Sequence, residues 1–186
     1  MVKASPTAES AKHLSGSGLA AKHRLFVFAK NPVDVIASAG GLLVDRAGAG
    51  WDVQAYLDDV ATEADTRAMQ ILGVRKLLPA PAFELAKWPE FLIVGAELYR
   101  RNLLVRRLFQ AATQRNRTEV AMWGGCWPTD LGPGIGEVEH RLSSAAKAFK
   151  SHAMRTAGLT PDVTDVECFR HGKRRYTIAE PLLPPA

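Results

Sequence analysis

A glycine-rich segment at residues 124–136, Gly-Gly-Cys-Trp-Pro-Thr-Asp-Leu-Gly-Pro-Gly-Ile-Gly, is the most distinctive stretch of this sequence. It connects an apolar run to an expected helix, a place where free backbone amides bind anions. It lacks the Lys and Ser/Thr of a P-loop and the compact spacing of a dinucleotide fingerprint. The segment therefore indicates either an anion site or a loop that uses glycine for conformational freedom. The anion-binding candidates in it are Gly124, Gly125, Gly134 and Gly136.

Arg101 is a further anion-binding candidate, and it comes with a partner. Glu97 and Arg101 are four residues apart at the start of an expected helix over residues 97–114, directly after an apolar run. They should share one helix face at the edge where an open α/β sheet binds its ligand. A helical wheel places Arg101 inside the apolar stripe, which favours an internal ion pair. The functional alternative is a bidentate clamp on a phosphate or carboxylate.

Other reactive residue types occur without a complete catalytic signature. Cys126 and His140 would form a thiolate–imidazole pair only if the fold brought them together, and the wheel puts His140 on the solvent side of a helix expected at residues 137–157. We therefore predict that Cys126 is a packing residue and assign no catalytic residue. An acidic cluster after another apolar run is interpreted as a helix cap and, as the alternative, as a ribose or cation contact. Its members are Asp58, Asp59, Glu63 and Asp65.

One segment resembles a known family. Asn31-Pro32-Val33-Asp34 precedes a Gly40-Gly41 pair, and Gly50-Trp51-Asp52-Val53 follows. This order resembles the opening of the PIG-L-like zinc-dependent N-acetylglucosaminyl deacetylases, whose His-Pro-Asp-Asp start supplies metal ligands and a general base. Here Asn31 replaces the ligand His, Val33 replaces an acid, and no His-x-x-His follows. Zinc would lack its ligands, so we attribute the resemblance to shared α/β architecture, assign no family, and predict neither a metal nor another cofactor.

Positive charge is concentrated in two places. The net charge is +5, residues 96–117 hold six arginines against Glu97, and the first 24 residues hold four bases against Glu9. In addition to these two segments, a further basic group surrounds an expected hairpin tip near Gly172. Such a basic face is typical of surfaces that bind nucleic acid or acidic proteins. Its candidate residues are Arg100, Arg106, Arg107, Arg170, Lys173, Arg174 and Arg175.

Short apolar runs alternate with stretches of helical period, which predicts a parallel sheet covered by helices on both faces. The expected fold is a three-layer, doubly wound, mostly parallel α/β sandwich, Rossmann-like or flavodoxin-like, with a candidate antiparallel C-terminal hairpin. The expected strands are residues 25–29, 53–57, 91–94, 120–123 and 167–170, with 176–179 as antiparallel partner. The expected helices are residues 33–47, 63–72, 97–114 and 137–157, and the proline-containing stretch 73–90 is expected to be a long connection.

Length and composition bound the class of protein. A chain of 186 residues with 47% hydrophobic residues suits one globular domain, which we place at residues 24–180, between a disordered basic tail at 1–23 and an extended tail at 181–186. The two cysteines favour a reducing compartment. No run approaches the roughly 20 apolar residues that span a membrane. We therefore expect a cytoplasmic protein that does not insert into membranes.

The charge pattern favours a non-catalytic binding or regulatory module that contacts nucleic acid or an acidic protein surface through its basic face. The alternative is a small enzyme acting on an anionic small molecule at the carboxyl ends of the strands. In that alternative Arg101 and the glycine-rich loop hold the anion, and Asp58, Glu97 or Cys126 supplies the chemistry. The sequence leaves the oligomeric state open.

Overall fold

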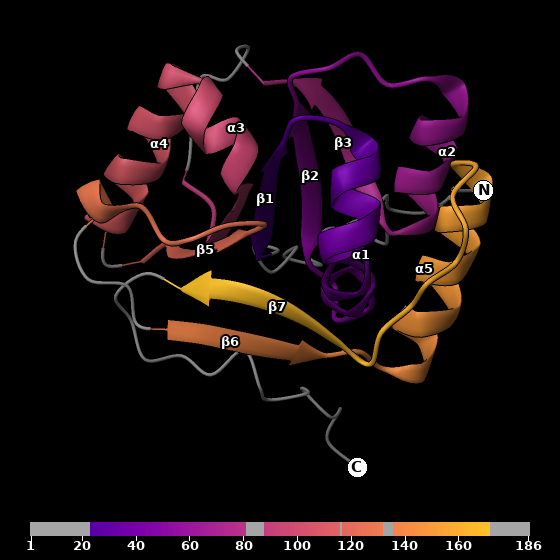
Figure 1. Cartoon of the computed structure of the whole chain (residues 1–186). Coiled ribbons are helices and arrows are strands. Elements are labelled where there is room, and N and C mark those ends of the chain that lie inside the picture. Colours follow the sequence, from indigo (N-terminus) through magenta and orange to yellow (C-terminus); the bar gives the residue numbers. More distant parts are fainter. Residues whose placement is uncertain (1–22, 81–87, 116, 132–135, 172–186) are drawn as a thin grey trace, which may run out of the picture.

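The computed structural model describes residues 23–80, 88–115, 117–131 and 136–171. In these ranges the strands and helices alternate (Figure 1). The elements in chain order are β1 (Arg24–Ala29), α1 (Pro32–Gly48), β2 (Asp52–Leu57), α2 (Glu63–Ile71), β3 (Val74–Pro79), β4 (Phe91–Gly95), α3 (Ala96–Arg101), α4 (Leu103–Thr113), β5 (Glu119–Trp123), a 3-10 turn (Thr129–Leu131), β6 (Gly136–Arg141), α5 (Ser144–Thr156) and β7 (Val166–His171).

The strands form one mixed sheet in the order β3-β2-β1-β4-β5-β7-β6. The first five of these pair in parallel, whereas β7 runs antiparallel to both β5 and β6. The predicted doubly wound, mostly parallel α/β fold with antiparallel C-terminal strands is confirmed. The chain leaves β1 toward β2 and β3 on one side and returns to β4 on the other, which creates a switch point between β1 and β4.

Helices α1, α2 and α5 cover one face of the sheet, and α3 and α4 cover the other (Figure 1). Each face has its own apolar cluster because successive strand residues point to opposite sides. Val27 and Ile93 belong to the cluster under α1, whereas Phe28 and Val94 belong to the cluster under α4. Burial on both faces explains the continuous apolar runs of the central strands. None of the helices in the described residues is long and apolar enough to cross a membrane.

The single helix expected at residues 97–114 is wrong, because the chain breaks at Asn102. The backbone there is extended, with φ −108° and ψ 109°, and the Asn102 side chain accepts hydrogen bonds from the amides of Leu104 and Val105. Asparagine satisfies the free amides of a helix start better than it fills a helix interior. Two helices at an angle replace the one helix, so the wheel that placed Arg101 in an apolar stripe does not apply.

The helix expected at residues 137–157 is also wrong in its first part. Residues 136–141 form strand β6, and α5 begins only after Ser143, whose hydroxyl accepts a hydrogen bond from the Ala146 amide at 3.0 Å. Val138 and His140 turn inward in alternation, and the next apolar residue, Leu142, comes at a spacing that a helical pattern shares. The strand pairs with β7 and takes the place expected for residues 176–179, which lie outside the described residues.

Strand β3 is absent from the predicted elements, which treated residues 73–90 as a connection. It lies at one edge of the sheet, and only its first residue, Val74, is buried. An edge strand with exposed Arg75 and Lys76 lacks the apolar run that identifies a central strand. Pro79 ends the strand, in keeping with the confinement of proline to edges and strand ends.

Candidate functional site

The carboxyl ends of β1 and β4 meet at the switch point, and each is followed at once by a charged side chain. Lys30 follows β1, and Glu97 lies in the first turn of α3 after β4. Although the two residues are 67 positions apart, the Lys30 ammonium lies 2.9 Å from Glu97 Oε1. Open α/β sheets bind their ligands at this location. The switch point is therefore the first candidate for a functional site.

Glu97 holds two cations. Arg101 Nη1 lies 3.2 Å from the same oxygen, Oε1, that contacts Lys30. The hydrogen bonds from Lys30 and from Arg101 lower the pKa of Glu97, so the carboxyl is ionised at neutral pH. The Arg101 side chain is 58% exposed, which makes the predicted internal ion pair wrong. The predicted pairing itself is confirmed, but it lies in water and leaves one of the two positive charges uncompensated.

A second group forms where α1 begins. Asn31 caps the helix by accepting a hydrogen bond from the Asp34 amide at 2.9 Å. The Asp34 carboxylate atom Oδ1 accepts from Trp123 Nε1 at 3.0 Å and from the Ser38 hydroxyl at 3.4 Å. Trp123 ends β5, so this contact joins the first turn of α1, which follows β1, to a strand that is not a neighbour of β1 in the sheet.

Gly95, at the end of β4, lies against both of these side chains. A Cβ at this position would lie 2.9 Å from Asp34 Oδ2 and 3.1 Å from the indole ring of Trp123. Glycine is therefore the residue that lets the carboxylate and the indole approach the β4 backbone. Sequence reasoning missed this group as a site. The only signal for it was the Asn-Pro-Val-Asp segment of the deacetylase resemblance.

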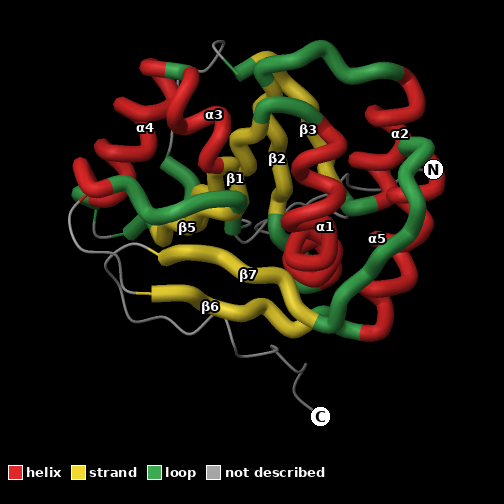
Figure 2. The backbone as a smooth tube through the Cα atoms, in the orientation of Figure 1, coloured by secondary structure: helices red, strands yellow, loops and turns green. Residues whose placement is uncertain are grey.

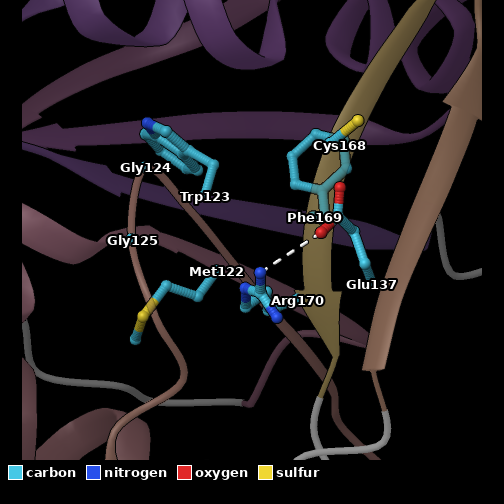
Figure 3. Close-up of a pocket in the computed structure, with 8 residues that line it drawn as sticks. All are labelled: Met122, Trp123, Gly124, Gly125, Glu137, Cys168, Phe169 and Arg170. Carbon is cyan, nitrogen blue, oxygen red and sulfur yellow. Dashed lines mark hydrogen bonds and ion pairs between the residues drawn. The ribbon is translucent and has the colours of Figure 1, made fainter.

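A pocket is lined by Trp123 and its neighbours at the end of β5 and by residues of β6 and β7 (Figure 3). Arg170 contacts Glu137 across it at 3.2 Å, and the Cys168 side chain lines it. Burial raises the pKa of the Cys168 thiol, and the neighbouring Glu137 raises it further. The thiol is therefore protonated at neutral pH and is a poor nucleophile. The lining residues are Met122, Trp123, Gly124, Gly125, Glu137, Cys168, Phe169 and Arg170.

The glycine-rich loop begins directly at this site. Gly124 has φ +74°, a left-handed conformation that favours glycine. A Cβ on Gly125 would lie 2.9 Å from the Ala96 side chain and 3.2 Å from Arg100 Nη1. These glycines therefore have a conformational or packing reason, and the Arg100 guanidinium lies close to the loop. Gly136 begins β6 with φ +121°, and Gly134 lies outside the described residues.

The predicted basic face is divided in the structure. Arg106 donates to the carbonyl oxygens of Arg100 and Tyr99, at 2.7 and 3.4 Å, and so completes the end of α3. Arg170 on β7 is paired with Glu137 on β6, whereas Arg107 is exposed on α4. The remaining candidates, Lys173, Arg174 and Arg175, lie outside the described residues.

The reactive candidates of the sequence analysis are placed apart. His140 is buried on β6, not on the solvent side of a helix, and its Nε2 lies 2.9 Å from Asp45 Oδ2. Cys126 is exposed in the loop after β5, so the prediction that it is a packing residue is wrong. In the acidic cluster, Thr62 and Asp65 form a reciprocal capping box, which confirms the helix-cap interpretation for that carboxylate.

Exposed apolar side chains gather near the same edge. Among the described residues, five large hydrophobic side chains are exposed, and four of them follow the carboxyl ends of β1, β2 or β4. Asn102, which lies beside two of them, donates to Asp58 at 3.4 Å and so brings the α3–α4 junction to the loop after β2. The four residues are Val33, Val60, Leu103 and Leu104.

No family model and no curated protein matches the chain. Solved structures do match. The deacetylase–teicoplanin complex of teicoplanin biosynthesis is 13% identical, covers 80% of this chain and 97% of its own, and has a TM-score of 0.56. The A40926 pseudoaglycone deacetylase Dbv21 is 12% identical over 81% and 97%, with a TM-score of 0.57. The N,N'-diacetylchitobiose deacetylase from Pyrococcus horikoshii is 10% identical over 80% and 83%, with a TM-score of 0.53.

These similarities show an LmbE-like, Rossmann-like fold. They also correct the predicted function. The similar folds are those of deacetylases, which are enzymes, so the interpretation as a non-catalytic binding module is wrong and the enzyme alternative is the better supported one. The short segment that resembles deacetylases in sequence, residues 31–34, lies at the carboxyl end of β1 within this shared fold.

The residues at that position do not fit a zinc ion. Asn31 uses its side-chain oxygen to cap α1, and the side chain of Val33 has no donor atom. Within the described residues, no group of three or more His, Cys, Asp or Glu side chains is placed to hold a metal ion. Zinc sites use three or four such ligands.

Proposed function

We propose that this chain is a small enzyme that acts on an anionic small molecule at the carboxyl ends of β1, β4 and β5. The observation that carries the proposal is the contact of both Lys30 and Arg101 with one oxygen of Glu97, at 2.9 and 3.2 Å, at the switch point of the sheet. A substrate carboxylate or phosphate would compete with Glu97 for these two donors. Guanidinium and ammonium groups bind such oxyanions strongly.

Asp34 is the proposed proton acceptor. Its Oδ1 is held by Trp123 and Ser38, whereas Oδ2 accepts no hydrogen bond from the described residues. Removal of an acyl group by water is the first reaction to test, because the similar folds are those of deacetylases. In that reaction the water oxygen bonds to the acyl carbon while one of its protons passes to Asp34. The bond from the acyl carbon to the leaving group then breaks, and Asp34 returns the proton to the leaving group.

The substrate should also carry an apolar part. The exposed side chains of Val33, Val60, Leu103 and Leu104 follow the same strand ends as the charged network. An apolar portion of a substrate that covered them would bury this surface, at about 25 cal/mol per Å². The proposal therefore favours amphiphilic anions over small inorganic or fully polar ones.

The proposal includes the expected cytoplasmic location. Cys126 and Cys168 are both free and exposed. Exposed free thiols are typical of proteins in a reducing compartment.

The test is hydrolysis of a panel of acylated compounds, with and without a carboxylate or phosphate and with short or long apolar chains, in the presence of a chelator. The double variant Lys30→Ala, Arg101→Ala should raise KM for anionic substrates by tenfold or more and leave neutral ones unchanged, whereas Asp34→Asn should lower kcat. Lys147→Ala is the matched control, because Lys147 also pairs with an acid, Asp165, at 2.6 Å on the surface. Absence of turnover across the panel, or equal kinetics in all variants, would contradict the proposal.

A further inference from the structure

We infer that Trp123 is a positioning residue, and that with Gly95 it fixes the Asp34 carboxylate by direct hydrogen bonding at a place where deacetylase-like motifs bind metal. The same geometry leaves the Asp34 carboxylate unsuited to a zinc ion, and this metal inference does not depend on the proposed function. The positioning role rests on the proposed function.

The Trp123 indole is well suited to this task. Its side chain is only 2% exposed, so its N–H group needs a protein acceptor, and that acceptor is Asp34 Oδ1 at 3.0 Å. A buried N–H left without a partner is unfavourable, because it has lost its hydrogen bond to water. The buried ring and its donor therefore hold the carboxylate oxygen in one orientation, and the Ser38 hydroxyl lies on the same oxygen at 3.4 Å.

Gly95 packs against both the Asp34 carboxylate and the Trp123 indole. A Cβ there would meet Asp34 Oδ2 at 2.9 Å and two ring atoms of Trp123 at 3.1 and 3.2 Å. The Asp34 carboxylate comes from α1 and the Trp123 indole comes from β5. Because both groups approach the backbone of position 95, that position must lack a side chain. Three segments that are distant in the sequence are thus fitted to one another at this point.

The same unit is unfavourable for a metal ion. A cation at Asp34 Oδ1 would have to displace the indole donor, and the motif positions Asn31 and Val33 offer a capping amide and an apolar side chain. A lone carboxylate does not retain zinc, which needs three or four ligands. In this chain hydrogen-bond donors occupy Asp34 Oδ1, and Oδ2 faces the Gly95 backbone.

The metal inference is tested by NMR of the 15N-labelled protein, which has four indole N–H signals, one for each tryptophan. Trp123→Phe assigns the Trp123 signal. In Asp34→Asn this signal should shift and its hydrogen exchange should become at least tenfold faster, whereas Asp162→Asn, at an exposed aspartate, should leave it unchanged. Equimolar zinc added to the parent protein should not move it. Zinc binding that depends on Asp34, or an unchanged signal in Asp34→Asn, would overturn the inference.

The positioning role is tested on the substrate that the acyl panel identifies. Trp123→Phe keeps the ring and removes the donor, so kcat should fall at least fivefold while KM stays within twofold. Gly95→Ala, which pushes on both partners, should lower kcat in the same way. A parallel change of kcat and KM, or none, would overturn the role. Absence of activity in the parent protein would overturn the proposed enzyme and this role, while the NMR result would still decide the metal inference.

Discussion

In the described part of the chain, two lysine–glutamate pairs lie in opposite environments. Lys30 and Glu97 meet at the carboxyl edge of the sheet with side chains 30% and 47% exposed, whereas Lys150 and Glu167 meet between α5 and β7 with both side chains 2% exposed. The two ion-pair distances are similar, at 2.9 and 2.7 Å. Exposed pairs contribute little to stability, but a buried pair cannot lose a partner without a large cost. The pair in water is thus free to exchange partners, and the buried pair is part of the fold.

The buried pair Lys150–Glu167 forms hydrogen bonds with the backbone of α1 near the middle of this helix. Glu167 accepts hydrogen bonds from the amides of Gly41 and Leu42, each at 2.8 Å, and Lys150 donates to the Ala37 carbonyl at 2.6 Å. In a regular α-helix the Gly41 amide would itself donate to that carbonyl. Side chains from two other elements therefore serve the backbone of α1 near its middle. Figure 2 shows that α1 changes direction along its length.

This arrangement connects the two regions. The first half of α1 carries Asn31 and Asp34 at the candidate site, and the Glu167 contacts lie where the second half begins. The buried pair holds the helix against β7 and α5, while the exposed pair lies at the mouth of the site. The comparison predicts that substitutions at the buried Lys150–Glu167 pair change stability, whereas substitutions at the exposed Lys30–Glu97 pair change function.

The largest expected effect is that of Lys150→Met. It leaves the Glu167 carboxylate buried without its cation and the Ala37 carbonyl without its donor, so the free energy of unfolding should fall by about 3–5 kcal/mol. Urea unfolding measures this loss. Lys147→Met, on the same helix but in an exposed pair, should change it by less than about 1 kcal/mol. Equal losses of unfolding free energy in Lys150→Met and Lys147→Met would contradict the expected difference between the buried and the exposed pair.

Gly41→Ala should have the next largest effect. A Cβ at Gly41 would overlap the Leu142 side chain and lie 3.1 Å from Glu167 Oε1, so we expect a loss of about 1–3 kcal/mol from overpacking. Gly40→Ala is the matched control, because its Cβ would lie 3.4 Å from Leu72 and Lys150, close to ordinary contact. There the gain in helix propensity, about 1 kcal/mol, offsets the tight fit. Thermal unfolding of both variants decides, and a Gly41→Ala protein as stable as Gly40→Ala would contradict the prediction.

The smallest expected effect is the pH dependence of the exposed pair. The hydrogen bonds from Lys30 and Arg101 lower the folded-state pKa of Glu97 below that of the unfolded chain, so their contribution to stability is fully present above the unfolded pKa. It is lost as the pH falls through the folded pKa. Carboxyl NMR titration should show that Lys30→Ala raises the pKa of Glu97. A Glu97 pKa that Lys30→Ala leaves unchanged would contradict the contact.

Local patterns predicted much of the fold. The apolar runs at β1, β2, β4 and β5 are signatures of strands buried on both faces, and the predicted positions of α1 and α2 are confirmed. The errors came from residues with two local uses. Asn102 fits a helix surface as well as a cap, and the spacing of Val138 and Leu142 suits a helix as well as a strand followed by a turn. Only packing against other elements separates such alternatives.

The candidate site divides in the same way. The sequence alone determined that the metal motif is incomplete, because the donor chemistry of Asn31 and Val33 is a property of the residues themselves. It also determined the Glu97–Arg101 pair, which needs only one helical turn. The tertiary structure decided that Lys30 joins Glu97 across 67 positions and that Trp123 holds Asp34 across 89. Such contacts depend on the order of the strands in the sheet, and no local pattern of residues encodes that order.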